Sequence, residues 1–234
     1  MTFLTRWRDD TSRPTAREFG RDLAVRVLPP LVVWWLAVLA MGWLITDGPL
    51  KELGVSEESV NKSLESSRTA LWDGVTLVFS WTGATVSIVG VCLVVVALFW
   101  WRTKRWWYAV VPLIAISLQA MVFFFTTLLI DRERPDVEKL DDSPPTSSFP
   151  SGHTGAATGL YFTLGLMALQ IANPVLRRLV VGVCVVIPFL VASARLYRGM
   201  HHVSDVLVAI ANGLVATVLA WCWLRRGDAD QTRA

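Results

Sequence analysis

The chain has 234 residues, of which 53% are hydrophobic and 18% are charged, and its mean hydropathy is +0.48. A soluble domain carries about 25% charged residues, so this composition excludes an ordinary soluble protein and indicates an integral membrane protein. The net charge of +3 could suggest nucleic-acid binding, but the arginines fall in small clusters between apolar runs. This distribution is typical of the positive-inside rule, so we expect contact with the lipid bilayer and no nucleic-acid partner.

The N-terminal region, residues 1–26, is polar and rich in arginine, and we expect it to form a cytoplasmic segment. Pro29 and Pro30 follow, and proline is tolerated in the first turn of a helix, where its missing N–H costs little. The first apolar span is therefore expected to run from Pro29 to about Ile45.

Residues 46–71 form a polar connection in which acidic side chains outnumber basic ones, as expected for a loop outside the membrane. Within it, Leu53, Val60, Leu64 and Leu71 recur on one narrow helical face. The pattern predicts an amphipathic helix. It would either lie on the outer leaflet near a site and guide a lipid, or serve as an ordinary connector.

Five further apolar runs predict helices that span the membrane. Gly83 and Gly90 in the first of them are expected to permit close helix approach, and Pro188 to kink a later one. The expected spans are residues 75–101, 106–130, 151–172, 179–194 and 203–224.

Basic clusters lie at alternate ends of these runs. Six spans with both termini in the cytoplasm would place every basic cluster on the cytoplasmic side, as the positive-inside rule requires. We therefore predict an all-α polytopic bundle of six transmembrane helices over residues 27–225, with a short cytoplasmic tail at residues 226–234 and no second domain. Cys92, Cys184 and Cys222 lie in apolar runs without metal-ligand spacing, so we expect neither disulfides nor a metal site.

Three polar islands interrupt the apolar second half of the chain, at residues 131–135, 149–153 and 195–205. In the six-span arrangement all three fall at the outer face of the membrane, where they can converge. All three histidines of the protein lie in the second and third islands. Arginines, a Ser-Gly turn and a His/Asp pair together indicate phosphoryl transfer.

The third island contains His201 and Asp205, four residues apart at the start of a helix. This spacing places them on one face, where the carboxylate can accept a hydrogen bond from one imidazole nitrogen and leave the other free to attack. His202 is three residues from Asp205, so spacing alone leaves either histidine as the nucleophile.

The second island places Ser151, Gly152 and His153 at the start of a helix. Backbone amides and the helix dipole at such a position favour a bound phosphate, and His153 could donate a proton to a leaving oxygen. The three residues could equally be an ordinary helix cap.

Arginines in the first and third islands provide guanidinium forks that match phosphate oxygens. We assign Arg134 and Arg195 to phosphate binding. Arg132 is a further candidate, and for Arg132 and Arg198 an ordinary ion pair or an interfacial position is an equal alternative.

The three motifs, Arg134-Pro135, then Pro150-Ser151-Gly152-His153, then Arg195 with His201 and Asp205, resemble those of the type 2 phosphatidic acid phosphatase family. These are membrane lipid phosphatases that share a site with vanadium haloperoxidases. The resemblance covers residues 127–205 closely. It implies His201 as nucleophile rather than His202, with Asp205 as its partner and His153 as the acid.

The resemblance also implies phosphate-binding roles for Arg134, Ser151, Gly152 and Arg195, without a metal or other cofactor. Two positions depart from the family pattern: Thr127 stands where the family usually has lysine, and Ala194 where it usually has serine. Neither departure touches the nucleophile, its partner or the acid. We expect catalysis to survive and substrate choice to change.

The implied function is hydrolysis of a lipid phosphate or diphosphate through a phosphohistidine. The substrate could be undecaprenyl diphosphate, phosphatidylglycerol phosphate or phosphatidic acid. The implied location is a bacterial inner membrane, with the site outside the cytoplasm. A phosphotransferase that uses the same residues and a catalytically silent lipid-binding member are the alternatives.

Overall fold

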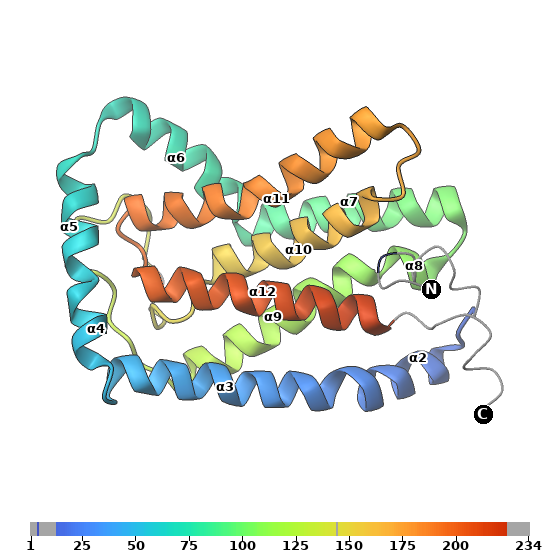
Figure 1. The fold of residues 1–234 in the computed structure, drawn as a ribbon, viewed down its shortest axis with the longest axis horizontal. Coiled ribbons are helices and arrows are strands. Elements are labelled where there is room, and N and C mark those ends of the chain that lie inside the picture. The colour runs from blue at the N-terminus through green and yellow to red at the C-terminus, as the bar shows by residue number, and fades with distance from the viewer. Residues whose placement is uncertain (1–3, 5–12, 144, 224–234) are drawn as a thin grey trace.

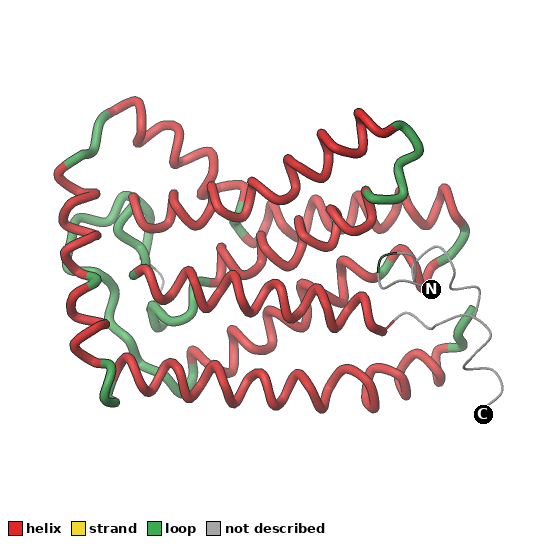
Figure 2. The backbone as a smooth tube through the Cα atoms, in the orientation of Figure 1, coloured by secondary structure: helices red, strands yellow, loops and turns green. Residues whose placement is uncertain are grey.

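The computed structural model describes residue 4, residues 13–143 and residues 145–223, and the regular structure within these residues is entirely helical (Figure 2). The expected tail at 226–234 lies outside this part of the chain, as do residues 1–3 and 5–12 of the expected N-terminal segment. The all-α expectation is confirmed for the described residues. The helices are α2 (Ala16–Asp22), the π-helix η1 (Leu23–Val27), α3 (Leu28–Thr46), α4 (Lys51–Ser56), α5 (Glu58–Ser66), α6 (Ala70–Thr82), α7 (Thr85–Thr103), α8 (Trp106–Ala109), α9 (Val111–Thr127), α10 (Gly152–Ala168), α11 (Pro174–Tyr197) and α12 (Val203–Trp223).

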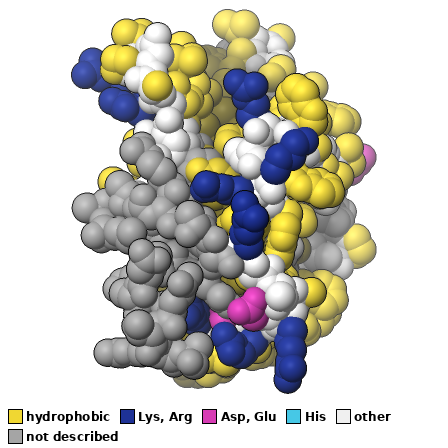
Figure 3. All heavy atoms as spheres, turned by 90° about the vertical axis from the view of Figure 1, so that its right-hand side faces the viewer, with side chains coloured by type: hydrophobic (Ala, Val, Ile, Leu, Met, Phe, Trp, Pro, Cys, Tyr) yellow, Lys and Arg dark blue, Asp and Glu magenta, His cyan; other side chains and the backbone are white. Residues whose placement is uncertain are grey.

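The long helices run side by side, and α4 and α5 cross one end of the bundle (Figure 1). Helix α10 is central, since it packs against α9, α11, α12 and α7. The starts of α10 and α12 and the end of α11 therefore meet at the end that α5 covers. At the opposite end, where α7 turns into α8 and α10 into α11, Lys and Arg side chains gather (Figure 3).

Within the described residues, four helical stretches are long and apolar enough to cross a membrane, and α9 is a shorter apolar helix. Large apolar side chains on these helices point outward, among them Val33, Val86 and Leu179, each more than 60% exposed. Such a surface is unfavourable in water and favourable against hydrocarbon. The protein is therefore an integral membrane protein. The four stretches are Ala16–Thr46, Thr85–Thr103, Pro174–Tyr197 and Val203–Trp223.

The first helical stretch begins at Ala16, upstream of the expected start at Pro29. Thr15 and Glu18 form a capping box, which satisfies free amides at the helix start. Prolines inside a helix remove hydrogen bonds, and here the π-helix η1 lies directly before Pro29 and Pro30. Cap chemistry therefore sets the boundary upstream of the prolines.

The expected span at residues 75–101 is two helices, α6 and α7, separated at Gly83 and Ala84. An added Cβ at Gly83 would lie 2.6 Å from Val191 and 3.2 Å from the carbonyl oxygen of His153, so close approach was correctly predicted there. At Gly90 a Cβ would meet nothing within 4 Å, so the same interpretation of Gly90 was wrong. The break lets α6 pack on α11 while α7 packs on α10.

Candidate functional site

The three polar islands meet at the end of the bundle that α5 covers. The first lies just after α9, the second leads into α10, and the third joins α11 to α12. Phe149, in the loop between α9 and α10, is fully buried in the hydrophobic core. It anchors the polar residues beside it to the bundle.

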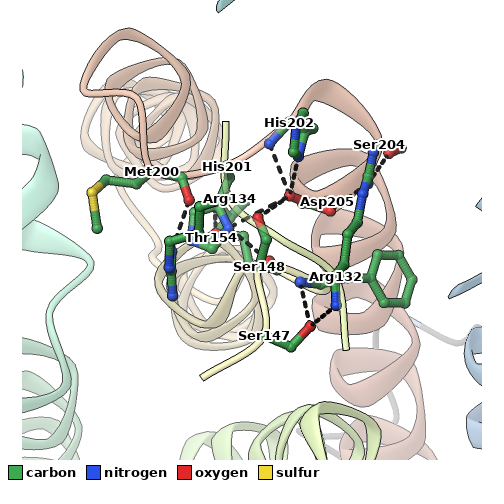
Figure 4. A network of polar contacts seen from close by, with 12 residues as sticks. Arg132, Arg134, Ser147, Ser148, Thr154, Met200, His201, His202, Ser204 and Asp205 are labelled. Carbon is green, nitrogen blue, oxygen red and sulfur yellow. Dashed lines mark hydrogen bonds and ion pairs between the residues drawn. The ribbon is translucent and has the colours of Figure 1, made fainter. Parts of the chain in front are cut away.

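Asp205 stands at the centre of a network of polar contacts (Figure 4). Its side chain is fully buried in the first turn of α12. It accepts hydrogen bonds from Ser148 Oγ at 2.6 Å, from the backbone N–H of His202 at 2.8 Å and from Arg132 Nη1 at 2.6 Å. A buried carboxylate needs such donors, and here they fix its position.

The ring of His201 is held mainly by a backbone carbonyl. Its Nδ1 atom lies 2.8 Å from the oxygen of Ser148 and 3.7 Å from Oδ2 of Asp205. A proton on Nδ1 can be donated to that carbonyl, which leaves the lone pair on Nε2. The sequence-based expectation that Asp205 accepts this hydrogen bond therefore differs from the geometry, in which the carboxylate is a close charge.

Burial lowers the pKa of His201 below its ordinary value, the carboxylate of Asp205 opposes this lowering, and the charges of Arg195 and Arg134 add to it. The ring is therefore neutral at physiological pH, which a nucleophile requires.

His202 points away from His201 toward α5. Its Nε2 lies 3.4 Å from Glu58 Oε2, and its Nδ1 lies 3.4 Å from Asp205 Oδ2. Both ring nitrogens therefore face carboxylates, which would repel a negatively charged phosphate. The environments of the two rings favour His201 as nucleophile.

The arginines of the first island have different surroundings. Arg132 donates from Nη1 to Ser204 Oγ at 2.6 Å as well as to Asp205, and from Nη2 to Glu57 Oε2 at 3.0 Å. Arg134 donates from Nη1 to the carbonyl oxygen of Met200 at 2.7 Å, while its buried Nε has no hydrogen-bond partner among the described residues.

Arg195 and Arg198 share one acidic partner, Asp141, from the loop before α10. Arg195 Nη1 donates to Asp141 Oδ2 at 2.6 Å and to Ser80 Oγ at 2.8 Å, and Arg198 Nε donates to Asp141 Oδ1 at 2.8 Å. Burial alone would raise the pKa of Asp141. The hydrogen bonds from Arg198 and Ser80 nevertheless hold this pKa below its ordinary value. Within the described part of the chain, the buried Nε of Arg195 has no partner.

The second island forms the start of α10. Ser151 is the N-cap residue and is fully buried, and its Oγ donates to Thr154 Oγ1 at 3.0 Å. A Cβ at Gly152 would lie 3.1 Å from the ring of Phe123, so the glycine allows α10 to start against α9. His153 is partly buried, and the charges of Arg195, His201 and Arg134 act on it. The structure thus brings all three predicted catalytic residues to one place, together with Arg134 and Arg195, whose Nε atoms have no partner among the described residues.

Four residues of this network were missed by the sequence analysis. Ser148 lies in a Ser-rich run and Asp141 in an acidic pair, and neither pattern distinguishes a site residue from a loop residue. Glu57 and Asn61 lie in the amphipathic connection, about 75 and 140 positions from their partners. Only tertiary structure reveals such pairs.

A cavity of about 790 Å³ opens beside the network, between the end of α9 and the loop before α10. Its lining combines apolar side chains with charged ones of both signs, namely Phe123, Phe124 and Leu128 with Arg132, Arg134, Lys139, Asp131 and Glu133. A lining with apolar and basic side chains suits an amphiphile with an anionic head. Thr127, which departs from the family pattern, also lines this cavity.

A family model described as the PAP2 superfamily matches residues 107–228, which is more than half of the chain. No curated protein matches the sequence. Two solved structures share the fold. The first is a transmembrane PAP2-type phosphatidylglycerolphosphate phosphatase from Bacillus subtilis, with 22% identity, a TM-score of 0.71, and coverage of 88% of this chain and 96% of that one. The second is LpxE from Aquifex aeolicus, with 18% identity, a TM-score of 0.56, and coverage of 69% and 92%.

Proposed function

The chain belongs to the PAP2 superfamily, and from this premise we propose that it is a membrane phosphatase that hydrolyses a lipid phosphate or diphosphate through a phosphohistidine. One observation carries the proposal. The buried Nε atoms of Arg134 and Arg195 lack partners among the described residues, and the charges of both arginines act on His201, whose Nδ1 faces a carbonyl. Unpaired buried donors beside a free imidazole nitrogen suit a phosphate group in line for attack.

In the first step, Nε2 of His201 attacks phosphorus and the bond to the leaving oxygen breaks. His153 donates the proton that the leaving group needs, and Asp205 stabilises the positive charge that develops on the His201 ring. In the second step, His153 takes a proton from water, the hydroxide attacks phosphorus, and the phosphorus–nitrogen bond breaks. Inorganic phosphate and the original imidazole are the products.

Charge on the phosphate oxygens is neutralised by Arg134 and Arg195, which remain charged at physiological pH. The start of α10 adds backbone amides at Gly152 and the residues after it, with Ser151 as the cap. These groups can stabilise the transferring group without a metal ion, so we propose a metal-independent reaction.

For Arg132, sequence left phosphate binding and an ordinary ion pair as alternatives, and this proposal takes the ion pair. Its two terminal nitrogens already donate to Glu57, Ser204 and Asp205. We assign it to positioning the Asp205 carboxylate.

The proposed orientation has six membrane crossings, with α6 and α7 together forming one of them. The basic end of the bundle would face the cytoplasm, and the site would open on the outer side of a bacterial inner membrane. Lipid substrates that fit this placement are undecaprenyl diphosphate, phosphatidylglycerol phosphate and phosphatidic acid. The Bacillus subtilis relative is named as a phosphatidylglycerolphosphate phosphatase, which favours testing that lipid first.

The test is phosphate release by detergent-purified protein from each of the three lipids, with a chelator present. We expect release from at least one lipid that survives chelation and is lost in His201→Ala. Chelator-sensitive release would contradict the metal-independent route. No release by folded wild-type protein would contradict hydrolysis, and an acceptor-dependent phosphorylated product would indicate a transferase instead.

A further inference from the structure

The helix α5 connects two membrane-crossing segments, yet its polar face is directed at the catalytic residues. Asn61 Nδ2 donates to the carbonyl oxygen of His201 at 3.0 Å, and Glu58 Oε1 accepts from the backbone N–H of Asp136 at 2.9 Å. Val60, on the same helix, is 41% exposed.

We propose that Glu57, at the start of α5, is a positioning residue that acts on the catalytic carboxylate Asp205 through Arg132. This inference rests on the proposed function and assigns a further residue to the same reaction. It makes the connection between the first two crossings a part of the active site.

The carboxylate of Glu57 is engaged at both oxygens. Oε1 accepts from the backbone N–H of Ser204 at 3.0 Å, and Oε2 accepts from Ser204 Oγ at 2.8 Å and from Arg132 Nη2 at 3.0 Å. Ser204 directly precedes Asp205. Glu57 thus holds the backbone at the start of α12 as well as the guanidinium that contacts the catalytic carboxylate.

The three charged groups form a buried row, Glu57, Arg132 and Asp205. Their side chains are 11%, 7% and 0% exposed, and Arg132 Nη1 lies 2.6 Å from Asp205 Oδ1. At such burial, charges interact strongly because water does not screen them. Without Glu57, the positive charge of Arg132 would neutralise the carboxylate of Asp205. With Glu57, the two carboxylates and one guanidinium carry a net negative charge, which stabilises the imidazolium of His201.

The contribution should fall on the chemical step rather than on substrate binding, because the side-chain hydrogen bonds of Glu57 within the described residues go to Arg132 and Ser204, neither of which binds phosphate in this proposal. Loss of its charge weakens the stabilisation of the imidazolium, which exists only after attack begins. Such an interaction affects kcat and kcat/KM together and leaves KM little changed.

The experiment compares Glu57→Gln with wild type and with a control, Glu52→Gln, on the exposed side of the neighbouring helix α4. We expect Glu57→Gln to lower kcat about tenfold, with KM within about twofold, since hydrogen bonds to charged groups are among the strong ones. Glu52→Gln should match wild type. Thermal unfolding of each purified variant shows whether it is folded, and the rates are compared per amount of folded protein.

Two further variants distinguish charge from shape. Glu57→Asp keeps the charge at a shorter length and should retain more activity than Glu57→Gln, whereas a purely structural role predicts the reverse order. In a double-mutant cycle with Arg132→Gln, the two effects should be strongly non-additive, because one residue acts through the other.

Three results would overturn the proposal: an unchanged kcat in folded Glu57→Gln, a higher activity of Glu57→Gln than of Glu57→Asp, or strict additivity with Arg132→Gln. Each requires an active wild-type protein. A wild type that releases no phosphate overturns the proposed function and this inference with it, so the two failures are distinguishable.

Discussion

The Nδ1 atom of His201 lies 2.8 Å from the carbonyl oxygen of Ser148, and this contact orients the ring on which the proposed reaction depends. The same serine donates from Oγ to Asp205 at 2.6 Å. One loop residue therefore holds both the proposed nucleophile, through its backbone, and the carboxylate beside it, through its side chain.

Replacing Ser148 by alanine should lower kcat about tenfold while KM changes little. The substitution removes a hydrogen bond to a buried carboxylate but leaves the backbone carbonyl in place, and bonds to charged groups contribute about 1.5–3 kcal/mol. Steady-state kinetics on the preferred lipid measure this effect. Ser66→Ala, at an exposed position on α5, is the control and should have wild-type activity. A Ser148→Ala variant as active as wild type would contradict this role of Ser148.

The pH dependence of kcat/KM should have an acid limb below about 6.5, the ordinary pKa of histidine. Burial lowers the pKa of His201, so the neutral, nucleophilic ring persists to lower pH than in a free histidine. The charged and titratable groups that act on it are Asp205, Arg195, Arg134 and His153.

In Asp205→Asn the acid limb should move to still lower pH, because the carboxylate is the group that opposes the lowering. Its residual activity should also be small. A limb that moves to higher pH in this variant, or lies above 7 in wild type, would contradict the neutral-nucleophile account.

Asp141→Asn should lower stability by about 3 kcal/mol, because it leaves the buried guanidinium groups of Arg195 and Arg198 without their anionic partner. Thermal unfolding in detergent measures the loss, and Asp142→Asn at the adjacent exposed position serves as the control. Similar unfolding temperatures for the two variants would exclude the structural role of Asp141.

The contribution of Asp141 to stability also has a predicted pH dependence. Its pKa is lower in the folded protein than the ordinary value of about 3.9. The unfolded chain therefore binds its proton first, so the contribution is complete above that value and is lost as pH falls toward the folded pKa. The difference between wild type and Asp141→Asn should accordingly shrink on acidification and persist on raising the pH above neutral.

Gly199→Ala should disturb the link between α11 and His201. Gly199 has a φ of +70°, and an added Cβ would lie 2.7 Å from Val137 and 2.8 Å from the carbonyl oxygen of Glu138. The positive φ is unfavourable for any residue other than glycine, and an added Cβ would clash with its neighbours. We expect lower stability and lower activity, whereas Gly182→Ala, where a Cβ meets nothing within 4 Å, should have neither effect.

The sequence could suggest candidate site residues, which the structure brings together, because each island carries its own chemistry in a short segment. His201 and Asp205 are four positions apart and were expected on one helix face, but α12 begins only at Val203, so His201 lies in the loop before the helix. Long apolar runs likewise predicted the helical bundle. The break at Gly83 could not be read from the apolar pattern, because hydropathy continues through it while tertiary packing on α10 and α11 divides the helix.

The partners of the arginines could not be predicted for a different reason. Arg132 and Arg195 look alike in sequence, since each is an arginine at the end of an apolar run. Their roles differ because Glu57 and Asp141, distant along the chain, meet them in different places. Charge pairing across 50 or more residues depends on the fold and leaves no local pattern.

The most direct test of the central claim is to trap the phosphoenzyme. Protein mixed with lipid substrate labelled in the transferred phosphate would be quenched in alkali within the first turnover and mapped by mass spectrometry. The account predicts label on His201, none in His201→Ala, and accumulation in His153→Ala if that histidine activates the water. Label on another residue, or rapid turnover of folded wild type without any labelled protein, would contradict nucleophilic catalysis by His201.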